Sequence, residues 1–189
     1  TVRFCPYGWK LCAGAFLYID ILAERQKGAK MARLTTLGVK FSYAVETVKG
    51  TKPTKFTQLE EASSIGGISL DTEQIDVSAL EDYLTQYAAG RQDTGGTWEI
   101  EFIMDPDKSV KQIKKLYEDS KAAKTTGLAT WFQVSFPDMS DSFFVIAECG
   151  REIPMPEIAQ NEAATMSISL IINTYKGLDT KIEPTAAAE

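Results

Sequence analysis

The segment 97–104 alternates between two kinds of side chain, and this pattern constrains the fold more than any other part of the sequence. One set of positions is Trp98, Ile100, Phe102 and Met104, and the other is Thr97, Glu99, Glu101 and Ile103. Successive side chains of a strand point to opposite sides, so the pattern predicts a β-strand with one buried face. Gly95-Gly96 opens the strand and Asp105-Pro106 closes it, because proline cannot continue the hydrogen bonding of a sheet.

Four other segments alternate in a similar way, and we predict strands at residues 38–48, 128–136, 142–150 and 164–174. In the segment 142–150 the second face is also apolar, because it carries Phe144 and Ile146. A strand that is apolar on both faces indicates contact with a helix or another subunit in addition to the core. Phe144 and Ile146 are therefore candidates for inter-subunit contacts.

The segment 107–123 is predicted to be a helix that Asp107 caps and Gly127 follows. Its apolar residues recur at helical spacing and are Val110, Ile113, Leu116 and Tyr117. Its other side carries Lys108, Lys111, Lys114 and Lys115. A lysine face of this kind is a candidate nucleic-acid patch, a solvated surface or a contact with an acidic neighbour. The acidic remainder of the chain favours the last two.

Two segments are less regular. Residues 56–70 are predicted to be a short strand and a long loop, or a disordered connector, because serine and glycine pairs interrupt them. Residues 71–89 are predicted to contain a short strand at 75–77 and a short helix at 79–84, which Ser78 and Glu81 would cap. Together the elements predict a mainly β fold, an antiparallel β-sandwich or barrel with one flanking α-helix.

The length of 189 residues suits one domain with appendages. Residues 1–30 differ from the rest, since their apolar run 7–22 contains Asp20, is shorter than the ~20 residues of a membrane span, and precedes no small-x-small cleavage site. If Met31 is the natural start, residues 1–30 are a leader or vector-derived sequence; otherwise they are an N-terminal arm. We expect a β-sandwich domain at 31–175 and a flexible tail at 176–189.

Composition excludes several kinds of site. The chain has no histidine, which removes Ser-His-Asp and Cys-His catalysis as well as the commonest metal ligand. Its three cysteines include no Cys-x-x-Cys pair, which argues against a disulfide framework or a zinc site. The net charge is −6. Residues 1–30 hold five basic and two acidic residues, so residues 31–189 carry 15 basic and 24 acidic residues, a net charge of −9.

Three kinds of candidate site are rejected on their sequence setting. Gly66-Gly67 and Gly95-Gly96 lack the Lys-Ser/Thr and the strand-to-helix setting of a phosphate loop. Asp71, Glu73 and Asp76 miss the calcium-loop pattern. Glu99 and Glu101 share a strand face about 7 Å apart, a spacing that suits glycoside hydrolysis, but no cleft aromatics accompany them. We therefore predict no catalytic residue, metal or cofactor, and expect a structural building block rather than an enzyme.

From Met31 onward the chain resembles the major tail tube proteins of long, non-contractile-tailed bacteriophages. The resemblance lies in the order and spacing of five pieces. These are the strand 38–48, the acidic segment 73–82, the run 87–100 with its glycines, the strand 131–138 that ends in Pro137-Asp138, and the closing segment 161–172. It covers most of residues 31–175 and has no counterpart for residues 1–30.

The resemblance implies a β-sandwich with a flanking helix, shared with contractile-tail tubes and the tube of type VI secretion. It also implies rings of six subunits that stack into a hollow tube and conduct DNA during ejection, in a virion tail assembled in the host cytoplasm. The implied partners are further copies of the chain, a tape-measure protein and a tail terminator. Double-stranded DNA would pass through without specific binding, and no membrane would be involved.

Particular residues follow from this reading as candidates. The lumen candidates are Glu99, Glu101 and Glu148, since carboxylates repel the phosphates of DNA. The segment 49–70 is the candidate inter-ring loop, and its charged candidates are Lys49, Lys52, Lys55, Glu60 and Glu61. Two alternatives stay open: the tube protein of a type VI-like or contractile injection system, with protein cargo, and a monomeric ligand-binding β-barrel, with a closed apolar pocket.

Overall fold

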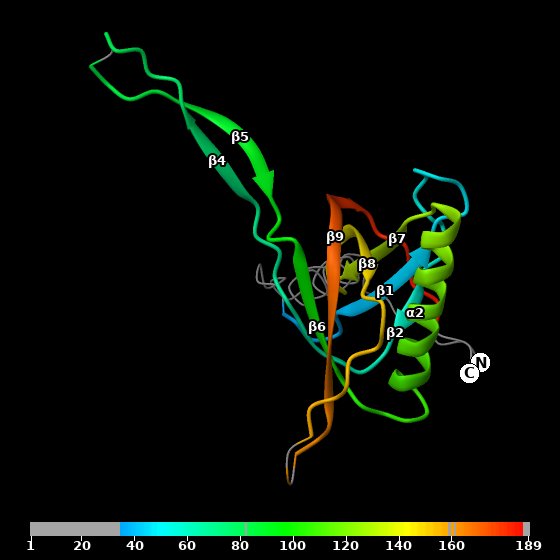
Figure 1. The fold of residues 1–189 in the computed structure, drawn as a ribbon. Coiled ribbons are helices and arrows are strands. Elements are labelled where there is room, and N and C mark those ends of the chain that lie inside the picture. Colours follow the sequence, from blue (N-terminus) through cyan, green and yellow to red (C-terminus); the bar gives the residue numbers. More distant parts are fainter. Residues whose placement is uncertain (1–34, 82, 159, 161, 187–189) are drawn as a thin grey trace, which may run out of the picture. The chain divides into compact units, whose positions relative to one another are not determined.

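The structure, a computed structural model, describes residues 35–81, 83–158, 160 and 162–186. Seven strands form one antiparallel sheet in the spatial order β2-β1-β7-β8-β9-β6-β3 (Figure 1). Their bounds are Lys40–Val45 (β1), Thr57–Leu59 (β2), Ala62–Ile65 (β3), Thr97–Ile103 (β6), Thr130–Ser135 (β7), Asp141–Cys149 (β8) and Thr165–Thr180 (β9). The strands Asp71–Asp76 (β4) and Tyr87–Asp93 (β5) form a separate hairpin, and the helix α2 spans Ser109–Thr126.

The seven-stranded sheet curls until strands near its opposite edges touch. The ring of Phe41 on β1 lies 5.6 Å from that of Trp98 and 6.2 Å from that of Phe102, both on β6, between ring centroids. Three strands separate β1 from β6 in the sheet, so these contacts require the sheet to roll. The edge strands β2 and β3 are joined by only Glu60 and Glu61, so a single segment of chain runs from one edge to the other.

The core fills the inside of this roll. Its buried members come from the inward positions of the strands and from one side of α2: Phe41, Tyr43, Leu59, Trp98, Ile100, Phe102, Ile113, Leu116, Tyr117, Phe132, Val134, Val145, Ala147, Met166, Ile168, Leu170 and Ile172. The predicted alternation of 97–103 is confirmed, since its burial follows the period of two. The expected class, mainly antiparallel β with one flanking helix, is confirmed for the described residues.

Gly127 follows the helix α2 as predicted, but the helix runs to Thr126 instead of ending at residue 123, and it begins differently. Gly127 adopts the left-handed conformation (φ 71°), and the N–H of Leu128 donates to the carbonyl of Ala123 at 2.9 Å. The expected capping by Asp107 is wrong, because the cap position is Lys108 and no side chain caps it. The hydroxyl of Ser109 instead donates to the carbonyl of Ile103 at 2.8 Å and ties the helix to the end of β6.

Gly66 fixes the chain directly after β3. Its N–H donates to the carbonyl of Glu99 at 2.8 Å, and its own carbonyl accepts a hydrogen bond from Trp98 Nε1 at 2.6 Å. A Cβ at this position would lie 2.8 Å from the Glu99 carbonyl oxygen. The close approach of two backbones therefore requires glycine here.

A second, smaller cluster covers the opposite face of β1, β7 and β8. It is formed by Ala44, Phe56, Trp131 and Phe144. Beside it the buried carboxylate of Glu46 accepts hydrogen bonds from Trp131 Nε1 at 2.7 Å and from the N–H groups of Gly50 and Ala129 at 3.1 and 3.2 Å. This face explains why every residue of β7 is buried although the strand alternates.

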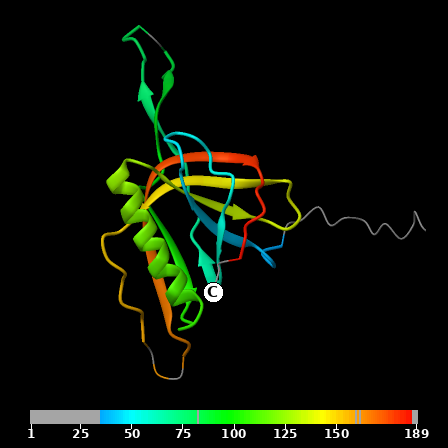
Figure 2. The same ribbon diagram turned by 90° about the vertical axis from the view of Figure 1, so that its right-hand side faces the viewer.

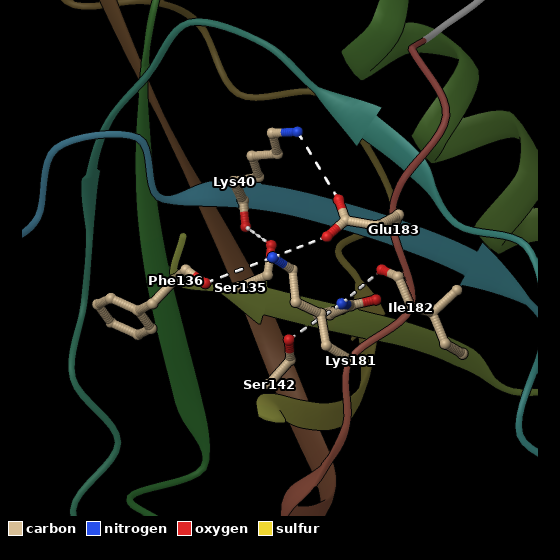
Figure 3. Close-up of polar contacts among 8 residues, drawn as sticks. Lys40, Ser135, Phe136, Ser142, Lys181, Ile182 and Glu183 are labelled. Atoms are coloured by element: carbon tan, nitrogen blue, oxygen red, sulfur yellow. Dashed lines mark hydrogen bonds and ion pairs between the residues drawn. The ribbon is translucent and has the colours of Figure 1, made fainter. Parts of the chain in front are cut away.

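Residues 181–185, here called the C-terminal strap, lie over this second face (Figure 3). The buried Gln133 donates through Nε2 to the carbonyl of Ile182 at 2.8 Å, and Lys181 Nζ lies 2.8 Å from a carboxylate oxygen of Glu183. The N–H of Thr185 donates to the carbonyl of Phe56 at 2.8 Å. The predicted end of the last strand at residue 174 is wrong, because β9 runs to Thr180 and the strap follows it.

Other expectations have different outcomes. The prediction of a short helix at 79–84 is wrong, since residues 79–81, 83 and 84 lie in the loop between β4 and β5. Ser78 does not cap a helix there; its Oγ accepts a hydrogen bond from the N–H of Gln86 at 2.8 Å across the loop. The expectations for residues 1–30 lie outside the described residues, and the domain boundaries stay a prediction.

We expect Glu46→Gln to destabilise the fold by about 1–3 kcal/mol, because an amide nitrogen cannot accept from the N–H groups that face it. Burial raises the pKa of the Glu46 carboxyl, but hydrogen bonds from Trp131, Gly50 and Ala129 outweigh burial and hold it below its usual 4.5. The stabilisation is therefore complete above pH 4.5 and is lost as pH falls through the lower folded pKa.

Urea denaturation of wild type and variant from pH 7 to pH 3 measures this effect. The difference in free energy of unfolding should shrink toward pH 3. Glu118→Gln, at an exposed position on α2, is the matched control. A difference that stays constant with pH contradicts the role assigned to the ionised Glu46.

Candidate assembly surfaces

Three strands bring the predicted lumen residues onto one outward face of the sheet. Glu99 and Glu101 on β6 lie opposite Ser169 and Ser167 on β9, and Glu148 on β8 lies opposite Ile171. Directly opposed residues share a face. We call this surface the acidic sheet face; it comprises Ser64, Thr97, Glu99, Glu101, Glu148, Ser167, Ser169, Ile171 and Asn173.

The three carboxylates of this face differ in their surroundings. Within the described residues no ion pair reaches Glu99 or Glu101, and β3, β6 and residues 165–173 contain no lysine or arginine. Glu148 lies 2.7 Å from Lys124 Nζ and accepts from Asn173 at 3.0 Å. These two hydrogen bonds, that of Lys124 first, hold the pKa of Glu148 below its usual value. Glu99 and Glu101 are therefore better lumen candidates than Glu148.

The side chain of Phe144 is already covered within its own chain. It is fully buried, with ring centroids 5.7 Å from Phe56 and 6.4 Å from Trp131. Lys52 Nζ lies 3.8 Å from the centroid of the Phe144 ring. The apolar second face of β8 is thus explained by an intramolecular cluster, which removes the basis for a subunit contact at Phe144. Ile146 is half-buried at the margin of this cluster, and its inter-subunit role stays a prediction.

The segment 49–70 is not a continuous loop, because the short strands β2 and β3 lie within it. Two of its charged candidates have partners in the same chain: Lys52 lies 2.8 Å from Asp179, and Glu60 lies 3.7 Å from Lys108. Glu61 has a positive φ of 62° at the crossing between the sheet edges, where its carbonyl accepts from the N–H of Ile103 at 2.9 Å. Lys49 and Lys55 are exposed, and their inter-ring role stays a prediction.

The hairpin β4–β5 is the most exposed element of the fold. In Figures 1 and 2 it extends away from the sheet, and every residue of β4 is exposed. Its loop carries Leu80, Tyr83 and Leu84, whose exposed fractions are 107%, 103% and 80%. A free two-stranded ribbon is marginally stable in water, which makes this element a candidate contact surface.

Sequence reasoning missed the hairpin for identifiable reasons. Ile75 and Val77 did indicate the first strand, but the second, Tyr87–Asp93, contains two alanines and a glycine and has little strand propensity. Gly90 lies against the neighbouring strand, because a Cβ there would lie 3.0 Å from the carbonyl oxygen of Glu73. A glycine in a strand marks such close approach, and this was the available signal.

No group of three or more His, Cys, Asp or Glu side chains able to hold a metal ion occurs in the part of the chain that the structure describes. Within the same part, no helix has the length and apolar character needed to cross a membrane.

Comparisons with known proteins give the following results. No family model matches the chain, and no curated protein sequence matches it. The structure is similar to a chain from the tail of an empty GTA particle with C6 symmetry, with a TM-score of 0.48 and 15% identity over 79% of this chain and 99% of that chain. It is also similar to a chain of the six-fold symmetrised baseplate of the anti-feeding prophage, with a TM-score of 0.40 and 9% identity over 75% and 90%. Both scores lie below 0.5.

We expect the sheet to fold without the hairpin, because β4 and β5 contribute no residue to either hydrophobic cluster. Replacing residues 71–93 by a short Gly-Ser linker should leave the melting temperature within roughly 5 °C of wild type. Thermal unfolding followed by circular dichroism measures this. A much larger loss would show that the hairpin supports the core.

Proposed function

We propose that the chain is a structural subunit that joins copies of itself into rings, and that the rings stack into a tube of the phage-tail type. The observation that carries the proposal is the acidic sheet face, an exposed sheet surface with two carboxylates that no cation of the described residues neutralises. Around a ring, copies of this face would line a channel.

The charge of that face suits DNA as the cargo. Duplex DNA carries one negative charge per ~1.7 Å of its axis, so a channel lined by lysine would bind it and slow its passage. Glu99 and Glu101 would repel phosphate, and the serines and threonines beside them offer neutral contacts. The net charge of −6 for the whole chain is consistent with a conduit that does not bind nucleic acid.

The hairpin β4–β5 is the better candidate for the connection between rings than the segment 49–70. It is exposed along its length and has apolar side chains at its tip, whereas β2 and β3 are held in the sheet. The proposal also includes what the sequence resemblance implies: six subunits per ring, a tape-measure protein and a tail terminator as partners, and a place in a virion tail. It further includes that the chain has no catalytic activity.

The two alternatives fare differently. A tube of an injection system would have the same subunit geometry and differ in its cargo. A ligand-binding barrel requires an open interior, whereas Phe41, Phe102 and Phe132 fill the inside of this roll, with Phe41 and Phe132 stacked at 5.7 Å. We therefore favour the tube over the barrel.

Negative-stain electron microscopy of the purified chain tests the proposal. We expect rings or tubes at high protein concentration, with six subunits in class averages. Particles that remain monodisperse monomers at the highest soluble concentration, in sedimentation and in micrographs, would contradict it.

Reversing the charge of Glu99 and Glu101 tests whether they line the channel. Tubes of Glu99→Lys with Glu101→Lys should retain duplex DNA at low salt and release it as salt is raised, whereas wild-type tubes should not retain it. Glu152→Lys, at an exposed position outside the acidic sheet face, is the control. Equal retention by the lining variant and the control would place the two glutamates outside the channel.

A further inference from the structure

The hairpin carries an acidic charge that its own strands leave unbalanced. Residues 70–94 include six acidic residues and one basic residue, Arg91. Asp71 on β4 lies directly opposite Asp93 on β5. Like charges in opposed positions destabilise a strand pair. A basic surface docked on the hairpin would remove this repulsion.

The helix α2 offers such a surface. Counting Lys108, residues 108–124 carry six lysines. Among the described residues, Lys114, Lys115 and Lys121 have no ion pair, and all three are exposed. The hairpin and these three lysines thus carry opposite charges, whereas Lys108, Lys111 and Lys124 are paired with Glu60, Asp107 and Glu148 in the same chain.

Beside the first half of α2 the surface is also hollowed. A groove of about 660 Å³ lies between the helix and the strands β1 and β2. Its apolar lining includes Tyr43 and Leu59. Its charged lining comprises Lys108, Lys111 and Lys115 together with Glu60 and Asp107, which pair with Lys108 and Lys111, so Lys115 is the lysine of the groove that has no ion pair among the described residues. We call it the α2 groove. It combines apolar surface with positive charge, and the hairpin combines apolar tip residues with negative charge.

We propose that the α2 groove receives the β4–β5 hairpin of a second copy of this chain. The inference rests on the proposed self-assembly and adds the surface that accepts the hairpin. The apolar tip residues Leu80, Tyr83 and Leu84 would lie against the apolar lining, and the carboxylates of β4 would face Lys111 and Lys115. Arranged head-to-tail, such a contact extends an assembly from copy to copy.

A second hollow provides the competing acceptor. It has a volume of about 580 Å³ and is lined by Val39, Ile65, Ile68, Phe136, Phe143 and Tyr175 among others, with no charged residue. It could cover the apolar tip of the hairpin but would leave the acidic strands unmatched. Charge complementarity therefore favours the α2 groove.

Zero-length carbodiimide cross-linking tests the pairing on the full chain. Equal amounts of unlabelled and ¹⁵N-labelled chains are mixed at high concentration, cross-linked and analysed by mass spectrometry. We expect peptides that join Asp71, Glu73 or Asp76 to Lys111 or Lys115, and that carry one label of each kind, which identifies them as intermolecular. Raising the salt to about 0.5 M should reduce their yield, because screening weakens contacts between exposed charges.

Charge-reversal variants provide a second test of the pairing. We expect Lys111→Glu with Lys115→Glu to weaken self-association roughly tenfold or more, as measured by sedimentation velocity. Combining it with Asp71→Lys and Glu73→Lys in the same chain should restore association. Arg151→Glu with Lys176→Glu makes the same change of net charge at exposed positions outside α2 and serves as the control.

The outcomes separate this inference from the proposed function. Rings or tubes that form normally with Lys111→Glu and Lys115→Glu, or mixed-label peptides that join the hairpin to lysines outside α2, overturn the pairing and leave the tube intact. A chain that neither associates nor gives mixed-label peptides overturns both.

Discussion

The fold depends on aromatic packing between strands that the sheet order keeps apart. The rings of Phe41 and Phe132 stack, and Trp98 meets both of them edge-on from β6. This packing holds the roll closed from within, while the short link between β2 and β3 closes it along the backbone. Once the inward positions are committed to this cluster, period-two geometry turns Glu99 and Glu101 outward. The exposed carboxylates are thus a consequence of the core.

The long strands and the helix could be predicted because each has one buried side over many residues. The segment 97–103 is the clearest case, since tertiary structure buries the side that its alternation marks. The same periodicity placed Glu99 and Glu101 together on the outer side of the sheet. Glu148 joins them through the pairing of β8 with β9, which is set by two register shifts that no local pattern reveals.

The remaining features depend on contacts that are distant in sequence. The alternation around Phe144 suggests a subunit contact because the second face of its strand is apolar. The strap and the segment at Phe56, both distant in sequence, cover that face within the same chain. Residues 79–84 carry helical signals, but Ser78 is engaged with Asp76 and Gln86 in a hairpin turn. Local propensity is a weak guide where a turn supplies competing hydrogen bonds. The α2 groove likewise combines residues of two strands and a helix, so no single segment indicates it.

The position of Gly66 affects the direction in which the hairpin β4–β5 leaves the sheet. The backbone of this residue is clamped on β6 by two hydrogen bonds, only five residues before β4 begins. A larger side chain would collide with the Glu99 carbonyl and push the start of the hairpin away from β6, while the aromatic core stayed in place. Small displacements at the root of an extended arm are magnified at its far end. The spacing between successive subunits of an assembly would then be set by a single backbone contact at the base of the arm.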